Sequence, residues 1–464
     1  MSLGTALNIA QNSLLSVSRR TDVVARNVAG ANDENYVRRE AATVAGSARG
    51  ATHVSRAALD AGLVRSALDA RSRAAGQSAL EEGLRLLSVE RDGPDGAQAP
   101  LAALSRLHDA LQTWSAAPAD DLLAEATGSV AQDVAASLRR ADRMLAARWS
   151  DTDKRIEADV RRLNERLADF ADANGAITGA RRTGAEPPLD AFDRRDAALR
   201  DIGEIIPVST LARPHGDLML LSARGATLFE TVPRTVSYDA AAPGVLIDGV
   251  PLSASGPDEP RGRLEAHLRL HETVRAARAE LDALAGATAD AFRPSGLFTA
   301  TGSTGAGTGA GTGTGTGTGS GARTGAAATI EVPAGYDMAT LRDGPPGLAD
   351  HIIAAAESLE APRAVAASGV PTQAGSVPTQ ASSVLALAGD AVSRLDERVR
   401  EAGGAAERLT RLHAVLDEKR VRKGGVDVDA EMTRLLALER SYEASARIIA
   451  VADRMLADLL AAVR

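Results

Sequence analysis

The sequence predicts a mainly α-helical protein: a long helical bundle with a small inserted β domain and paired coiled-coil helices at its N- and C-terminal ends. Three observations predict this fold class. Aromatic residues make up only 2% of the 464 residues, so a core must be built from Leu, Val, Ile and Ala, which suits closely packed helices. Apolar residues recur at steps of three and four near both termini. Short β-prone runs gather in one stretch.

The first helix is predicted to begin at Leu3, with Ser2 as its N-cap, and to end where Gly30, Asn32 and Asp33 interrupt the pattern. Its seam positions alternate steps of four and three residues, which is the heptad spacing of a coiled coil. They are Leu3, Leu7, Ala10, Leu14, Val17, Thr21, Val24 and Val28.

The last helix repeats this spacing. It is predicted to follow the Gly424-Gly425 break with an acidic first turn, because carboxylates favour a helix N-terminus. Its seam positions are Leu435, Leu438, Tyr442, Ser445, Ile449, Ala452, Leu456, Leu459 and Val463. Such a seam buries only a narrow stripe, so each terminal helix needs a partner, and the other terminal helix is the nearest candidate. The pattern fits either a core helix of a bundle or a polymerising coiled coil.

Helical periodicity also predicts interior helices at 60–90, 101–116, 120–174, 189–200, 264–292, 384–401 and 404–420. Four β-prone runs lie between the fourth and fifth of these, at 205–211, 218–221, 235–238 and 245–252, with turn signals at Gly225 and Asp248-Gly249. Residues 301–325 are dominated by Thr and Gly, which predicts a flexible linker.

These elements predict seven segments. They are an axial helix with its connecting loop at 1–58, a helical bundle domain at 59–200, a small β domain at 201–260, a returning bundle helix at 261–298, a Thr/Gly linker at 299–326, a helical region at 327–422 with a loose loop at 364–383, and a C-terminal axial helix at 423–464.

Charge and composition exclude several classes of function. The formal net charge is −8 without blocks of like charge, so we expect neither a nucleic acid nor a membrane as partner. The absence of cysteine removes disulfides, thiol nucleophiles and Cys-based zinc sites. We also expect neither a membrane span nor a cleavable signal peptide of the general secretion pathway.

No group of residues in the sequence fits a catalytic motif. His267 and His271 have the spacing of two zinc ligands, but the glutamate that a zinc protease places directly after the first histidine is Leu268 here. The alternation of Asp427, Asp429 and Glu431 fits helix capping better than a calcium loop. We therefore expect no enzyme activity, no metal and no cofactor.

The N-terminal stretch resembles the start of flagellar rod, hook and hook-associated proteins, where a heptad helix runs into an Asn-rich signature and a Tyr-x-Arg tail. Asn27, Val28, Ala29, Asn32, Tyr36 and Arg38 carry this resemblance. The family's Thr-Pro-Gly before the tyrosine is replaced by Asp33, Glu34 and Asn35.

The C-terminal stretch 424–460 is similar to the C-terminal helix of the same axial proteins. Its matching positions are Gly425, Val426, Asp429, Glu431, Leu435, Leu436, Tyr442, Ala444, Ser445, Ala446 and Ala452. Interior segments 54–63, 192–209 and 262–293 resemble the flagellar hook-associated protein 1 family, the first of the junction proteins between hook and filament.

The resemblance implies a structural protein secreted by the flagellar type III export apparatus and located in the extracellular flagellum, at the hook–filament junction. It implies a ring or tube of identical subunits whose paired terminal helices form the innermost layer. Hook protein, the second junction protein and a cytosolic export chaperone are the implied partners. The alternative is another axial protein, such as hook protein or the second junction protein.

The resemblance and the heptad pattern together select two groups of residues. The predicted assembly interface comprises Leu3, Leu7, Leu14, Val17, Val24, Val28, Leu435, Leu438, Tyr442, Ile449, Leu456 and Leu459. The signature residues are Asn27, Asn32, Tyr36, Gly425, Asp429 and Ser445.

Overall fold

A computed structural model describes residues 3–43, 52–92, 99–240, 244–251, 259–300, 325–343, 348–361, 363–364 and 381–462. The chain divides into two compact units. The first comprises Met1–Ser72, Leu163–Arg234 and Leu409–Arg464, and the second comprises Arg73–Arg162 and Thr235–Arg408. The predicted Thr/Gly linker and the loose loop lie mostly outside the described residues. The predicted mainly helical fold class is confirmed.

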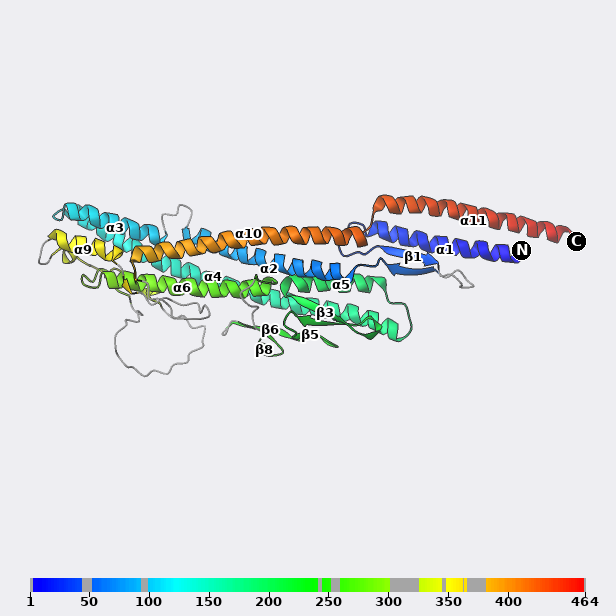
Figure 1. The fold of residues 1–464 in the computed structure, drawn as a ribbon, viewed down its shortest axis with the longest axis horizontal. Helices are drawn as coiled ribbons and strands as arrows, with labels where there is room; N and C mark the ends of the chain where they lie inside the picture. The colour runs from blue at the N-terminus through cyan, green and yellow to red at the C-terminus, as the bar shows by residue number, and fades with distance from the viewer. Residues whose placement is uncertain are drawn as a thin grey trace. The chain divides into compact units, whose positions relative to one another are not determined.

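The two terminal helices belong to the first unit and pack against each other. Helix α1 (Leu3–Ala29) lies beside α11 (Val428–Ala462), and the two run in opposite directions (Figure 1). α1 ends one residue before Gly30, as predicted. It is followed by an antiparallel hairpin of β1 (Arg39–Thr43) and β2 (Thr52–Arg56). The pairing of the terminal helices, predicted from their seams, is confirmed.

Three long helices contribute residues to both units: α2 (Ala61–Asp92), α4 (Asp121–Arg182) and α10 (Val384–Gly424). α4 continues past the predicted end at residue 174, and Gly184 follows it with a φ of 73°. A glycine in this left-handed conformation shortly after the last turn is a common helix stop.

The prediction of two helices at 384–401 and 404–420 is wrong, because α10 runs through Gly403 and Gly404 without a break. Interior glycines cost a helix only about 1 kcal/mol each. The alanines around them, Ala402, Ala405 and Ala406, are buried, and Gln77 donates a hydrogen bond to the Ala402 carbonyl oxygen at 3.2 Å. Tertiary packing therefore outweighs the low helix propensity.

The predicted β region contains two three-stranded antiparallel sheets, which fall in different units. After α5 (Leu189–Ile205), the first unit holds β3 (Val208–Ala212), β4 (Leu218–Ser222) and β5 (Thr227–Phe229). The second unit holds β6 (Val236–Asp239), β7 (Gly244–Ile247) and β8 (Val250–Pro251). Asp248 and Gly249, with φ of 49° and 80°, form the predicted turn between β7 and β8.

The second unit has a core of leucine, alanine and a few large aromatic side chains. Its other elements are α3 (Pro100–Ala116), α6 (Arg263–Ala291), α7 (Ala326–Thr329), α8 (Ala339–Arg342), α9 (Leu348–Glu360), β9 (Arg363–Ala364) and β10 (Ala381–Ser382). Trp114, Leu107, Leu138 and Phe292 are fully buried in this core. None of the described helices combines the length and the hydrophobicity needed to cross a bilayer.

The two histidines of α6 each face an aspartate of α4. His271 Nε2 lies 3.0 Å from Asp153 Oδ1, and the Tyr238 hydroxyl donates to the same oxygen at 2.5 Å. His267 Nε2 lies 3.5 Å from Asp159, which also pairs with Arg263 at 2.9 Å. Groups of three or more His, Cys, Asp or Glu residues that could hold a metal ion are absent from the described residues.

Burial lowers the pKa of His271, and the lowering outweighs the attraction of Asp153. With Nε2–H directed at Asp153, a proton on Nδ1 would be buried without an acceptor among the described groups. The folded state therefore favours the neutral imidazole, while the unfolded chain takes up a proton near the ordinary pKa of 6.5.

Because the pKa of His271 is lower in the folded state than in the unfolded chain, the protein loses stability as the pH falls. Between pH 7.5 and 5.5 the free energy of unfolding of the wild type should decrease by about 1 kcal/mol more than that of His271→Gln. Urea denaturation at the two pH values measures the difference. An equal decrease in both proteins would contradict the assignment of this pH dependence to His271.

Candidate assembly interface

The seam of α1 consists of two rows of side chains, each spaced by seven residues. Ala10, Val17 and Val24 are buried. The second row, Leu7, Leu14, Thr21 and Val28, is half-buried. This is the arrangement that a heptad predicts for a helix packed against one partner. The side chain of Leu3 lies outside the described part of the chain.

The seam of α11 has one inner row, Glu431, Leu438, Ser445 and Ala452, in which all members but the half-buried Leu438 are buried. Leu435 and Ile449 flank this row and are half-buried, whereas Tyr442 is 51% exposed. Leu456 and Leu459 also belong to the predicted interface, but their side chains are not among those described. The predicted positions thus form a narrow stripe whose edges stay open.

A hydrogen bond between two serines joins the helices. Ser13 Oγ lies 3.0 Å from Ser445 Oγ, and the Ser445 hydroxyl donates to the Ser441 carbonyl oxygen at 2.9 Å. Because a hydroxyl has one proton, Ser13 is the donor to Ser445. Ser445 is one of the signature residues selected from the sequence, whereas Ser13 is not. The sequence indicates Ser13 only through its spacing, because Ser13 lies two heptads before the signature residue Asn27, at positions 13, 20 and 27.

The signature residue Asn27 is a fully buried hydrogen-bonding hub. Its Nδ2 donates to the Arg39 carbonyl oxygen at 3.0 Å, and its Oδ1 accepts the Arg39 N–H at 2.9 Å. The Tyr36 hydroxyl donates to the same Oδ1 at 2.9 Å. One side chain thus fastens both the loop after α1 and the first residue of β1. Asn32, the other signature asparagine, is exposed.

The loop between α1 and β1 is closed by local contacts. The ring of Tyr36 lies so close to Gly30 that a Cβ at this position would come within 2.6 Å of it, so the position requires glycine. Where the family has Thr-Pro-Gly, Asp33 Oδ1 accepts the Asn35 N–H at 2.9 Å, and the Asp33 carbonyl accepts the Tyr36 N–H at 3.0 Å. This Asx turn stabilises the loop without proline.

Ion pairs tie the β1–β2 hairpin to α5. Arg39, which is buried, pairs with Asp190 and lies 3.4 Å from Asp193. Arg56 lies 3.0 Å from Asp193 and 2.7 Å from Asp196. Burial raises the pKa of Asp193 above its ordinary value despite both arginines. Arg39 and Arg56 were not selected from the sequence. The feature that could have indicated them is the row of aspartates spaced by three residues on α5.

The predicted break between the last two helices is made by two glycines. The Gly424 carbonyl accepts the Arg38 N–H at 2.7 Å, and a Cβ on Gly424 would lie 2.7 Å from the Leu59 side chain. A Cβ on Gly425 would lie 2.5 Å from the Val421 carbonyl oxygen. The α11 helix then starts with Asp427, whose Oδ1 accepts the Ala430 N–H at 3.1 Å.

Two acidic residues follow this N-cap. The Asp429 carbonyl accepts the Thr433 hydroxyl at 2.9 Å. Glu431 is buried in the inner row and pairs with Arg434 at 2.6 Å.

Beside its buried inner row, α11 exposes apolar side chains. They are Met432, Leu436, Tyr442, Ile448, Val451 and Met455. The exposed arginines Arg440, Arg447 and Arg454 repeat every seven residues and form a charged row on the same helix. A helix that is apolar well beyond one seam needs more than one neighbour to bury it. The arrangement is suited to binding other helices.

Comparison with known proteins identifies two segments. The helical domain of the flagellar hook-associated protein FlgK matches residues 98–294. The C-terminal domain of the flagellar basal body rod proteins FlgEFG matches residues 419–462. No curated protein matches the chain.

The flagellar hook junction protein FlgK from Burkholderia pseudomallei is a similar solved structure, with a TM-score of 0.43 and 18% sequence identity. The match covers 51% of this chain and 47% of the solved one, so the chain spans about half the length of that protein. The two domain matches cover the centre of the chain and its last helix, and the second includes the signature residues Gly425, Asp429 and Ser445. Both matches support the resemblance of the sequence to the flagellar hook-associated protein 1 family.

Proposed function

We propose that this protein is a structural component of the bacterial flagellum that forms the junction between hook and filament. The match of residues 98–294 to the FlgK helical domain is the observation that carries this proposal. The C-terminal match is to a domain of rod proteins, so it supports an axial protein without selecting one. The helical-domain match therefore favours a junction protein over the alternative of hook protein.

The protein acts by assembly with copies of itself. Identical subunits in a ring or tube bury the same surface in every copy, so a weak apolar contact is repeated around the axis. The flanks of α11, with Ile448 at 52% and Val451 at 57% exposure, supply such a surface. The seam positions of α1 and α11 hold the two helices together so that these flanks are presented as one unit.

The partners follow from this place in the flagellum. The protein binds hook protein on one side and the second junction protein on the other, and a cytosolic chaperone holds it before export. It is secreted and located in the extracellular flagellum. The family is one of structural flagellar proteins, and the function proposed requires no catalysis, metal or cofactor.

Electron microscopy of flagella from a deletion strain tests the proposal. We expect hooks without filaments and flagellin shed into the medium, with filaments restored by the wild-type gene. Normal filaments in the deletion strain would refute the proposal. Loss of the hooks themselves would instead identify the protein as hook protein. Antibody labelling should place the protein at the hook tip in a strain that lacks the second junction protein.

A further inference from the structure

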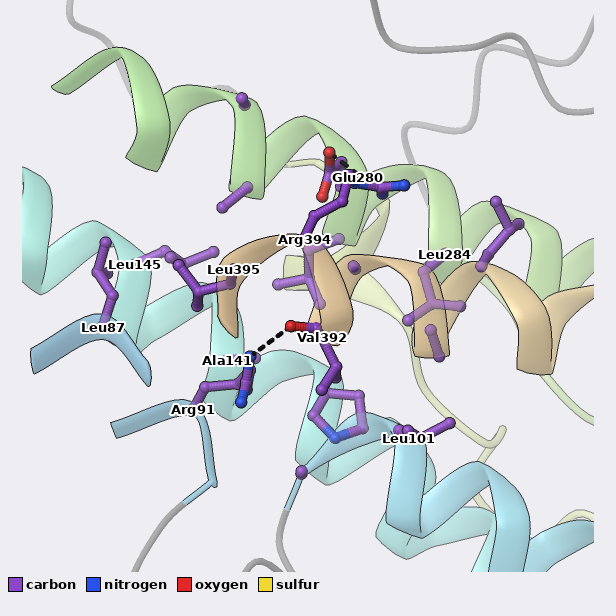
Figure 2. A pocket seen from close by; sticks show the side chains of 18 of the residues that line it. Leu87, Arg91, Leu101, Ala141, Leu145, Glu280, Leu284, Val392, Arg394 and Leu395 are labelled. Carbon is purple, nitrogen blue, oxygen red and sulfur yellow. Dashed lines mark hydrogen bonds and ion pairs between the residues drawn. The ribbon is translucent and has the colours of Figure 1, made fainter. Parts of the chain in front are cut away.

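The helical bundle of the second unit contains an apolar cavity of about 130 Å³. Its walls come from α2, α4, α6, α10 and the start of α3 (Figure 2). Leu87, Leu145, Leu281 and Leu284 line it and are buried. An engineered apolar cavity of about 150 Å³ in another protein binds benzene. The volume is therefore sufficient for a small apolar group.

The cavity exists because alanines lie opposite the leucines of its wall. Ala141 on α4, Ala277 on α6 and Ala388 on α10 all line it. Leucine contacts set the separation between helices, so a methyl group at these positions does not fill the space. A void without partner atoms forfeits dispersion energy, which an apolar guest of matching size would restore.

The charges at the cavity are unequal. Arg91 lies 3.0 Å from Asp396 and donates to the Val392 carbonyl oxygen at 3.2 Å, and Arg394 lies 3.3 Å from Glu280 (Figure 2). Arg398 also lines the cavity and is exposed. Among the described carboxylates, none lies within ion-pair distance of Arg398. Arg398 is therefore the lining arginine that forms no ion pair with a described carboxylate, and it lies beside an apolar interior.

We propose that this cavity is a binding site for a small amphipathic anion, with an apolar tail of about six carbons in the cavity and a carboxylate head at Arg398. The apolar walls favour an apolar tail over a polar group, because they offer no hydrogen bond to a polar group. Binding of the tail removes its apolar surface from water. The guanidinium of Arg398 is a fork of donors suited to a carboxylate. The site is independent of the proposed flagellar role, since no part of it belongs to the terminal helices.

Hexanoate and hexanol are the probes for this site, because they share a tail and differ in the charge of the head. Isothermal titration calorimetry and thermal unfolding of the full chain should show saturable binding of both. Hexanoate should bind about fivefold more tightly, as expected for one exposed ion pair, and should raise the melting temperature by a few degrees at saturation. Failure of both probes to bind the wild type would overturn the proposal.

Three variants locate the site. Ala277→Leu should fill the cavity and abolish binding of both probes, and Ala141→Leu fills it from another helix if the first variant does not fold. Arg398→Gln should remove the preference for hexanoate and leave hexanol binding unchanged. Arg400→Gln, on the same helix but away from the cavity, should behave like the wild type. Binding that survives both cavity-filling variants would place the probes elsewhere and overturn the assignment.

Discussion

Val451→Asp is expected to prevent incorporation of the protein at the hook while leaving the monomer folded. Val451 is 57% exposed on α11, so an aspartate there changes the free energy of unfolding of the monomer by no more than about 0.5 kcal/mol. In an assembly that covers the flanks of α11, the same carboxylate is buried without a partner, which costs several kcal/mol. The cost recurs in every copy of a symmetric ring. Incorporation should therefore fall by more than about tenfold.

Immunoblots of purified hooks and of the culture medium measure incorporation and export separately. Arg454→Asp is the matched control, because Arg454 is exposed in the row of arginines on the same helix. It changes the charge by two rather than by one and should nevertheless assemble. Ile448→Asp, at a second exposed apolar position, should repeat the defect. If Val451→Asp is exported and found on hooks at the wild-type level, the α11 flanks are not the assembly surface.

Asn27→Ala is expected to detach the loop after α1 and the start of β1. Removal of the amide leaves the Arg39 N–H, the Arg39 carbonyl and the Tyr36 hydroxyl without the partner that each has in the fold. An unsatisfied buried polar group costs about 1–3 kcal/mol. Because water can hydrate the polar groups of the opened loop, we expect the free energy of local unfolding to decrease by about 2–4 kcal/mol. Hydrogen exchange of the amides between residues 36 and 43 measures it as faster exchange.

Asn32→Ala is the matched control for this prediction. Both asparagines belong to the signature, but Asn32 is exposed and makes no hydrogen bond to any described residue. Its replacement should change stability by less than about 0.5 kcal/mol. Equal effects of the two substitutions would show that burial of Asn27 does not explain its place in the signature. Loss of assembly in Asn32→Ala without a change in exchange would point instead to a contact with another subunit.

The elements with strong local signals were predicted well. The heptad steps of α1 place Ala10, Val17 and Val24 in its buried row, because a helix that packs on one partner repeats its contacts every seven residues. The helix ends at Gly30 and Gly424-Gly425 were also predicted from the sequence, since glycine is often found where a backbone must approach another group closely. The expectation that His267 and His271 are not part of a zinc-protease motif rests on sequence alone, because Leu268 follows the first histidine.

Other features depend on which segments meet in space. The two glycines inside α10 are weak helix formers, and their segment is helical because Ala402 and its neighbours are buried by residues far away in the chain. The hub at Asn27 needs Arg39 and Tyr36 from the following loop, and the hairpin needs three aspartates more than 130 residues away to balance Arg39 and Arg56. These energies arise from burial and from pairing across distant segments, which a periodic pattern does not encode. The pattern shows which face of a helix is apolar; only the packed chain determines what that face and its polar neighbours touch.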